Sequence, residues 1–340
     1  MDNRSFLDLL ISCIPGLAPK DRVSLSEKFE REEDLIRLTK EEAEMSIGHI
    51  LKYFWNIDDI RAIAERNAQI CKSRSIEWVS WKEEAYPPLL REIYDPPVGL
   101  YYRGQLPDPE KPVLGMIGTR KPSFESSSFA HTLSRDVGAM GIPVVSGLAI
   151  GIDAISHRGN IEGGARTIAV LGSGPDEIYP SVNRQLARRI LDTGGVIFSE
   201  YPPGTGPHKW NFPARNRIIS GLSRSVLVVE APERSGALIT AGLALEHGKD
   251  LWVASSGVNM DGLKDSGPGT NVKAGFFDKR GTTKLVADGA EIISRAVDIT
   301  EKWNMDVSCN TGKSCEEARD SRECGKELAA SMAKIVGIDL

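Results

Sequence analysis

The sequence predicts an α/β protein in which a mostly parallel sheet carries helices on both faces, preceded by a small all-helical domain. Two observations lead to this fold class. From residue 112 onward, short apolar segments alternate with segments of helical periodicity, and segments such as 226–229 are apolar on both faces. That pattern is typical of parallel strands covered by helices. Before residue 80, apolar residues instead recur at helical spacing.

Residues 1–80 are expected to form the helical domain. Phe6, Leu9 and Cys13 have helical spacing and are followed by a Pro15-Gly16 turn. A short helix, a Pro-Gly turn and a second helix resemble a degenerate helix-hairpin-helix unit, which binds phosphates through turn amides. We favour a small packing domain, because the turn holds no basic residue. Further helices are predicted over 20–29, 40–45, 47–55 and 60–72.

Residues 81–111 are expected to form an extended linker arm between domains. Paired prolines stand at 87–88 and 96–97. Proline lacks an amide hydrogen and restricts the residue before it, so these pairs argue against helix.

Residues 112–298 are expected to form the sheet domain, and its ligand site to lie beyond the carboxyl ends of the strands. Strands are predicted over 113–117, 143–145, 167–171, 196–199, 225–229, 251–254 and, weakly, 284–286. Helices are predicted over 126–140, 150–161, 182–192, 214–222, 237–247 and 271–278. Residues 299–340 are expected to form a polar linker and one short helix over 327–338, with too few residues for a strong core of their own.

The overall charge excludes a protein that coats nucleic acid non-specifically. The 340 residues carry 42 Lys and Arg against 47 Asp and Glu, a net charge of −5. Five cysteines without a CxxC pair indicate neither a zinc site nor a disulfide framework, so no metal is expected. The apolar stretch 6–14 is too short to span a bilayer. We therefore expect a cytoplasmic protein with reduced thiols and no membrane association.

Against this acidic background, the stretch 209–224 is strongly basic. Four cations, Lys209, Arg215, Arg217 and Arg224, give it a local charge of +4 with no acid among its residues. Such a cationic island is typical of an anion-binding site. Lys209 and Phe212 lie three residues apart in a proline-bounded loop, where one can hold a phosphate and the other stack on a base. This combination points to single-stranded nucleic acid.

Arg215, Asn216 and Arg217 follow at the start of a predicted helix and are included in the expected DNA-binding set. Cations are unfavourable at a helix N-terminus. Either a recruited anion or a buried acid such as Glu200 or Glu230 accounts for the two arginines, and the sequence leaves both explanations open.

Three glycine-containing turns follow predicted strands and open helices. Their backbone amides and the helix dipole attract anions, and Arg120 adds a guanidinium that grips a phosphate with two donors. In the second turn's helix, Asp153 and His157 are expected to be structural rather than catalytic. The expected phosphate-binding residues of these turns are Gly118, Thr119, Arg120, Ser146, Gly147, Ser235 and Gly236.

Two common enzyme classes are disfavoured. The Gly172-Ser173-Gly174 turn begins like a dinucleotide fingerprint, but Glu177 stands where the third glycine belongs. A phosphate loop of the ATPase type is absent. No catalytic residue and no cofactor are therefore expected.

The motifs together resemble the DNA-processing protein A (DprA/Smf) family. The resemblance covers about residues 84 to 295 and rests on the segments DPPVGLYYRG, GTRKPS, SGLAIGIDAISH, SEYPPGT, KWNFPARNRIISGLS and SGALITA. It implies an extended Rossmann-like fold, single-stranded DNA binding, a homodimer, and loading of the RecA recombinase onto incoming strands during natural transformation. It also implies that Arg120, Lys209 and Phe212 contact DNA.

The sequence departs from this family in three places. Residues 253–257 replace the usual AVPG turn, the tail is too short for the winged-helix domain of many relatives, and the N-terminal region matches their sterile-alpha-motif-like domain only in general pattern. Trp210 has no counterpart in the family motif, so we expect it to be a packing residue.

The alternative function is a nucleotide-processing enzyme of the lysine-decarboxylase-like phosphoribohydrolase type, whose sheet and anion turns are similar. Its PGGxGTxxE motif is missing here. The nearest counterpart, Ser235-Gly236-Ala237, lacks the acid at the required spacing.

Overall fold

The computed structural model describes residues 3–51, 55–259 and 278–305, which fall into two compact units, Met1–Ile299 and Thr300–Leu340. Of the second unit, residues 300–305 are described. They include the end of α14 (Ala296–Lys302). The helix expected over 327–338 lies outside the described residues. The domain boundaries expected at 80, 111 and 298 remain predictions.

Five helices precede the sheet in the chain, and capping residues set their limits. Thr39 opens α4 with a reciprocal cap in which its hydroxyl accepts from the Glu42 amide. Asn56 caps α5 with a single hydrogen bond, which its side-chain oxygen accepts from the Asp58 amide. The helices are α1 (Asn3–Ser12), α2 (Pro19–Lys28), α3 (Glu32–Ile36), α4 (Lys40–Ile47) and α5 (Ile57–Ser73). Their buried residues, including Leu9, Leu10 and Leu25, form a common hydrophobic core.

The helix predicted over 47–55 is wrong in its described part. Gly48 adopts φ 77° and closes α4 in the left-handed conformation, so the helix cannot continue through it. The short α3 was not predicted, since five residues carry too little periodicity.

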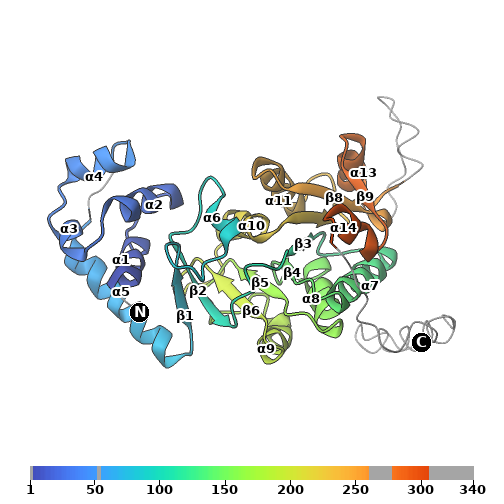
Figure 1. Ribbon diagram of the computed structural model, residues 1–340, viewed down its shortest axis with the longest axis horizontal. Helices are drawn as coiled ribbons and strands as arrows, with labels where there is room; N and C mark the ends of the chain where they lie inside the picture. The colour runs from blue at the N-terminus through green and yellow to red at the C-terminus, as the bar shows by residue number, and fades with distance from the viewer. Residues whose placement is uncertain (1–2, 52–54, 260–277, 306–340) are drawn as a thin grey trace. The chain divides into compact units, whose positions relative to one another are not determined.

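A nine-stranded, mostly parallel sheet forms the centre of the first unit, with the order β1-β2-β6-β5-β4-β3-β7-β8-β9 (Figure 1). All neighbours pair in parallel except β1 with β2 and β2 with β6. The predicted mostly parallel, Rossmann-like α/β fold is thereby confirmed. The strands are β1 (Glu77–Ser80), β2 (Gly99–Gly104), β3 (Leu114–Ile117), β4 (Val144–Ser146), β5 (Ile168–Leu171), β6 (Val196–Ser199), β7 (Ser225–Val228), β8 (Asp250–Ala254) and β9 (Glu291–Ile293).

Strand β1 lies within the segment expected to be helical, and strand β2 lies within the segment expected to be an extended arm. β2 pairs with β6, with Tyr101 opposite Ser199, so this part of the chain belongs to the sheet. Between them, Pro88 begins the short helix α6 (Pro88–Arg91). Proline is tolerated there because the first helical residue needs no amide hydrogen.

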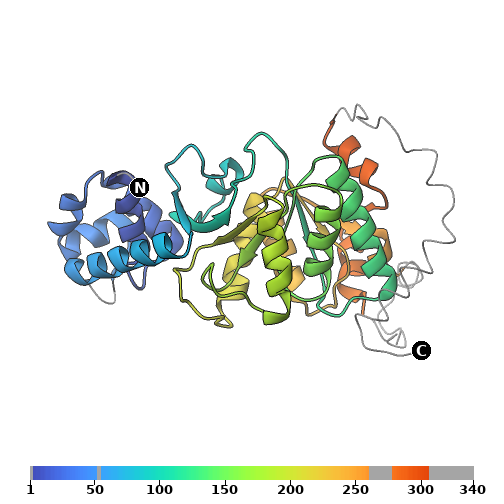
Figure 2. The same cartoon turned by 90° about the horizontal axis from the view of Figure 1, so that it is seen from below.

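Helices cover both faces of the sheet (Figure 2). From β3 the chain runs outward strand by strand to β6, and the three helices that connect these strands pack on one face of the sheet. It then returns through α10 to β7, on the other side of β3. Helix α10 packs with α11 on the opposite face. The strand order therefore reverses at β3 and β7, where ligands of such sheets usually bind. The first three helices are α7 (Phe124–Ala139), α8 (Ile152–Glu162) and α9 (Arg184–Asp192), and the last two are α10 (Asn211–Leu222) and α11 (Gly236–Glu246).

The strand predicted over 284–286 is wrong. These residues lie in α13 (Arg280–Ala287), and the last strand is β9, whose first two residues are exposed. Two 3-10 turns, η1 (Ser181–Asn183) and η2 (Ser255–Gly257), complete the described elements. The helix predicted over 271–278 lies almost entirely outside the described residues.

The central strands are buried on both faces, as their apolar sequences predict. All four residues of β3, β5, β6 and β7 are buried. Burial of one large aliphatic side chain contributes about 1.5–3 kcal/mol, so these strands give the sheet a rigid base for its loops. In the described part of the chain, every helix is too short or too polar to cross a bilayer.

Candidate nucleic-acid interface

A groove of about 730 Å³ lies where the strand order reverses. It is lined by the turn after β3, the loop before α10 and the turn after β7. These segments meet because parallel strands bring their following loops to one edge of the sheet. Nine predicted site residues line it: Gly118, Thr119, Arg120, Lys209, Phe212, Arg215, Asn216, Ser235 and Gly236.

The turn after β3 presents Arg120 to solvent from a firmly held backbone. The Thr119 amide donates to the Glu230 carbonyl at 2.7 Å, and the Thr119 carbonyl accepts from the Ile152 amide at 3.2 Å. Gly151 packs closely against this turn, since a Cβ there would lie 2.4 Å from the Thr119 carbonyl oxygen. Arg120 is therefore an exposed cation on a fixed support.

The N-terminus of α7, which follows this turn, is occupied by a carboxylate of the protein itself. Buried Glu230 accepts from the Ser123 amide at 3.1 Å and from the Ser123 hydroxyl at 2.6 Å. The suggestion that Glu230 pairs with Arg215 or Arg217 is wrong, because its carboxylate serves α7 instead. The negative charge at this helix end is thus supplied internally.

The turn at Ser146 and Gly147, which was expected to bind an anion, makes its hydrogen bonds within the protein. Both residues are buried, and the Ser146 hydroxyl donates to the Met116 carbonyl at 2.6 Å. The Gly147 and Ala149 amides donate to the Asp153 carboxylate at 3.2 and 3.3 Å. Burial raises the pKa of Asp153 above its usual range. The turn therefore binds an internal carboxylate, which gives Asp153 a structural role.

His157 lies on the same helix, α8, away from the groove lining. Its Nδ1 is 2.8 Å from the Thr167 hydroxyl, and the ring is fully buried. Burial, reinforced by the charge of Arg215, lowers the pKa of His157 to about 3. The imidazole is therefore neutral at physiological pH.

The loop before α10 exposes an aromatic pair as well as a cation. Lys209 is exposed, and Trp210 keeps 72% of its surface accessible. The expectation that Trp210 is a packing residue is therefore wrong. Its ring stacks on His208 with the centroids 4.9 Å apart and the planes 6° from parallel. The two rings together form a flat surface beside Lys209.

Phe212 occupies the first turn of α10 and is partly buried. A Cβ at Gly172 would lie 2.9 Å from the Phe212 ring, so glycine permits this close approach. The ring of Tyr179 lies 5.6 Å from that of Phe212, centroid to centroid. Sequence analysis did not single out Tyr179, His208 or Trp210 as site residues, although aromatic rings in loops at this edge were a visible signal.

Arg215 and Arg217 are both about 5% exposed but differ in their partners. The Arg217 guanidinium lies 2.7 Å from Glu200 and 3.1 Å from Asp95. Burial opposes its charge, but these two acids raise the pKa of Arg217 overall. Arg217 does not line the groove. Glu200, which is partly buried, is the acid partner that the sequence suggested.

Arg215 has no carboxylate within 4 Å among the described residues. Its Nη1 donates to the carbonyls of Gly147, at 2.9 Å, and Val170. Burial lowers the pKa of Arg215 to about 10. Its positive charge is thus held at the groove without a direct counter-ion.

The turn after β7 forms another wall of the groove. The Ser235 hydroxyl accepts from the Ala237 amide at 3.2 Å and so caps α11. Gly236 is exposed at the start of this helix. A neutral hydroxyl, rather than a carboxylate, occupies this helix end.

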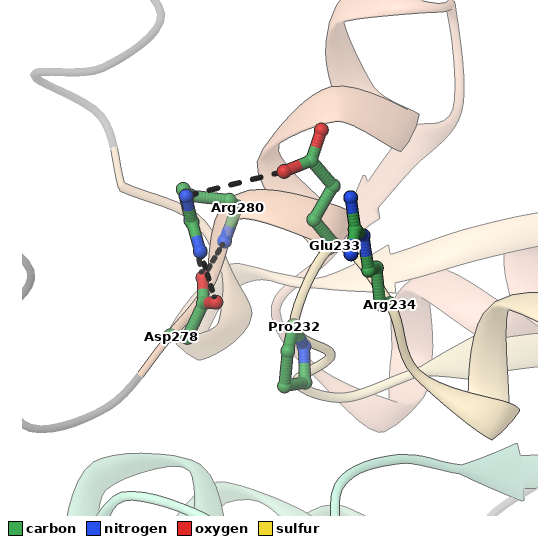
Figure 3. A pocket seen from close by; sticks show the side chains of 5 residues that line it. All are labelled: Pro232, Glu233, Arg234, Asp278 and Arg280. Carbon is green, nitrogen blue, oxygen red and sulfur yellow. Dashed lines mark hydrogen bonds and ion pairs between the residues drawn. The ribbon is translucent and has the colours of Figure 1, made fainter.

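A smaller hollow of about 320 Å³ shares Pro232 and Arg234 with the groove (Figure 3). There Arg280 forms ion pairs with Asp278 at 2.8 Å and with Glu233 at 3.9 Å, marked by the dashed lines. The hollow holds two acids, Glu233 and Asp278, as well as two arginines, Arg234 and Arg280, which makes it a poorer anion site than the groove. No cluster of His, Cys, Asp and Glu suited to a metal ion occurs in the described segments.

Comparison with known proteins places the chain in one family. The model of the DNA recombination-mediator protein A family matches residues 77–304. Protein Smf of Synechocystis sp. is 44% identical over 212 residues, 61% of this chain and 49% of that protein, so the match spans about half of its length. The DNA processing protein DprA of Bacillus subtilis is 38% identical over 68% of this chain and 72% of its own length.

Two solved structures share the fold. The DNA processing protein A of Streptococcus pneumoniae aligns with a TM-score of 0.67 and 30% identity, over 89% of this chain and 98% of that protein. The DNA processing protein A of Helicobacter pylori, whose structure concerns a single-stranded DNA binding mode, aligns with a TM-score of 0.54 and 28% identity. The alignment covers 67% of this chain and 96% of that protein.

Proposed function

The chain belongs to the DNA recombination-mediator protein A family, and from this premise we propose that it binds single-stranded DNA in the groove and acts as a non-enzymatic recombination mediator. One observation carries the proposal. Arg120 and Lys209, two exposed cations from loops 89 residues apart in the sequence (209 − 120), line the same groove as the aromatic ring of Phe212. Cations that track the backbone and rings that stack on bases are the two requirements of a single-strand site.

In this proposal each side chain has a distinct role. Arg120 and Lys209 hold successive phosphates, and Phe212, beside Tyr179, stacks on a base. The stacked His208 and Trp210 rings offer a second base platform next to Lys209. Arg217 has a structural role, since Glu200 and Asp95 neutralise it. Because the net charge of the protein is −5, affinity depends on these local contacts rather than on overall attraction.

The proposed cellular role is to protect incoming single strands and to help load RecA onto them during natural transformation. A cytoplasmic homodimer is part of this proposal. Light scattering measures the oligomeric state. RecA filament assembly on single strands coated with a single-strand-binding protein, with and without this protein, tests the loading role. An unchanged assembly rate would contradict that role without affecting the DNA-binding proposal.

The direct test is a titration of labelled oligo(dT) with the wild-type protein and with Arg120→Ala, Lys209→Ala and Phe212→Ala. We expect each variant to bind more weakly, and duplex DNA of the same length to bind weakly to the wild type. Affinity should fall with salt, and Lys209→Ala should reduce the slope of log K against log salt by about one unit.

The matched control is Arg188→Ala, which removes an exposed arginine on α9 outside the groove lining. Its affinity and salt slope should equal those of the wild type. Equal affinity of the wild-type protein for duplex and single strands would refute the proposed specificity. A loss of oligo(dT) affinity in Arg188→Ala as large as that in Lys209→Ala would refute the proposed location of the site.

A further inference from the structure

A small recess of about 80 Å³ adjoins the groove and is lined in part by Arg215, the buried arginine for which the described residues provide no ion pair. The recess and the groove share Arg120, Tyr179, Phe212 and Arg215 in their linings. We refer to it as the Arg215 recess. Its chemistry differs from that of the open groove, because one of its cations is almost completely removed from water.

Arg215 retains unused hydrogen-bonding capacity in this recess. Its Nη1 donates to two carbonyls, but its Nε has no partner among the described residues. Asp153 acts on it electrostatically at longer range, while the carboxylate of Asp153 accepts from the Gly147 and Ala149 amides. A buried charge without a paired ion is unfavourable, so a bound anion would stabilise this guanidinium.

The surroundings add positive potential. Phe212 and Arg215 lie in the first part of α10, a helix of 12 residues with no acid in its first turn and no side-chain cap. The N-terminus of such a helix carries a partial positive charge. Arg120 brings a second cation, and its charge further disfavours the positive charge of Arg215. Two guanidiniums and a helix N-terminus therefore converge here, and none of the described residues supplies a paired anion.

The size of the recess limits which phosphate groups fit into it. Its volume is roughly half that of a 150 Å³ cavity that accommodates benzene. The recess is therefore too small for a nucleobase. A phosphodiester inside a strand carries a nucleoside on each side and one negative charge. A terminal phosphomonoester has three free oxygens and a charge of about −1.5 to −2 at neutral pH, and its narrow end is unhindered.

We propose that the Arg215 recess binds the terminal phosphomonoester of a DNA strand, with Arg215 and Arg120 as its donors. This inference rests on the proposed function, because the strand itself occupies the adjoining groove. The protein then distinguishes phosphorylated strand ends from internal positions and from unphosphorylated ends.

The test compares oligo(dT) of one length carrying a 5′-phosphate, a 3′-phosphate or hydroxyls at both ends. We expect one phosphorylated end to bind about tenfold more tightly than the unphosphorylated strand, as for one or two charge-assisted hydrogen bonds. The preferred end identifies the polarity of the bound strand. Inorganic phosphate, at constant ionic strength, should compete more strongly against the phosphorylated strand and should remove its advantage.

Two variants separate the recess from the groove. Arg215→Gln should bind the phosphorylated and unphosphorylated strands equally. Because Arg215 also holds buried carbonyls, Ile150→Trp provides a variant that fills the recess from a residue 42% exposed and leaves the arginine in place. Lys209→Ala, in contrast, should lower the affinity for both strands by the same factor, so that the phosphorylated strand still binds more tightly.

The outcomes are distinguishable. Tight binding of the unphosphorylated strand, with no gain from either terminal phosphate, would overturn the recess proposal and leave the groove proposal standing. Failure of every strand to bind the folded wild-type protein would overturn both. A phosphate advantage that persists in Arg215→Gln and in Ile150→Trp would place the phosphate elsewhere and refute the recess.

Discussion

The N-termini of α7 and α8 differ from that of α10, although all three follow strands of the sheet and open at the same edge. The carboxylate of Glu230 accepts hydrogen bonds at the N-terminus of α7. The carboxylate of Asp153 accepts hydrogen bonds from two amides of the turn that leads into α8. At α10 the described residues provide no acid in the first turn, and Arg215 lies there without an ion pair. The difference shows that a glycine turn before a helix is not by itself an anion site. What matters is whether the protein supplies the anion.

The same contrast separates the two buried arginines of α10. Arg217 is neutralised by Glu200 and Asp95 and serves the fold, whereas Arg215 faces the groove. We therefore divide the edge into a closed region, with internal counter-ions, and an open region, with none. Changes in the closed region should alter stability, and changes in the open region should alter binding.

The largest effect is expected for Arg217→Met. It leaves the partly buried carboxylate of Glu200 without its cation, so the free energy of unfolding should fall by about 3–5 kcal/mol. Urea denaturation measures this loss. The double variant Arg217→Met/Glu200→Gln should recover part of the stability, because no charge is then left uncompensated. If Arg217→Met alone is as stable as the wild type, Arg217 does not belong to the closed region.

Glu230→Gln tests the closed region directly. The substitution removes the charge that accepts hydrogen bonds from the Ser123 amide and hydroxyl, and should lower the free energy of unfolding by about 1.5–3 kcal/mol. Oligo(dT) affinity of the folded protein should stay unchanged. Glu125→Gln, in the exposed first turn of the same helix, is the control and should change stability by less than about 0.5 kcal/mol.

Trp210→Ala tests the open region. Trp210 is 72% exposed, so the substitution should leave thermal stability unchanged. Loss of one stacking ring should weaken oligo(dT) binding by about 1–3 kcal/mol, with the salt slope unaltered because no charge is removed. Trp210→Phe should retain most of the affinity. Wild-type affinity in Trp210→Ala would show that bases do not stack there.

Acidification should destabilise the folded protein through the buried His157. The unfolded imidazole titrates near its ordinary pKa of 6.5, whereas burial lowers the folded pKa to about 3. Below pH 6.5 the unfolded chain therefore binds a proton that the folded chain does not. The stability contribution is complete above 6.5 and is lost toward pH 3, by about 1.4 kcal/mol per pH unit.

Urea midpoints between neutral pH and about pH 5 measure this dependence. In His157→Gln the other titrating groups remain, so the difference between the two pH profiles isolates the histidine. Parallel profiles would indicate that His157 is not held neutral by burial.

Sequence reasoning located the central strands because they are continuous apolar segments flanked by turns. The strands β3 to β8 were predicted to within one or two residues. β1, β2 and β9 were missed because pairing with a distant strand, rather than local periodicity, makes them strands. For example, β9 exposes Glu291 and Ile292 and is recognisable only from its pairing with β8. Residues 284–286 are too few to distinguish a strand from a helix by pattern.

The amino-acid sequence alone determined the α/β fold class and the edge of the sheet where the candidate site lies, and it placed Arg120 and Lys209 in loops at that edge. Phe212 was expected in the same loop as Lys209, but it lies in the first turn of α10. Local pattern and parallel-strand topology are sufficient for the fold class and the sheet edge. The family followed from the resemblance of the sequence motifs. Only the tertiary structure decided which turns already hold an anion. Glu230 and Ser123 meet across 107 residues of sequence, and burial decides the charge environment of Arg215. Neither long-range pairing nor burial is a property of a local segment, so neither was readable from the residues around each turn.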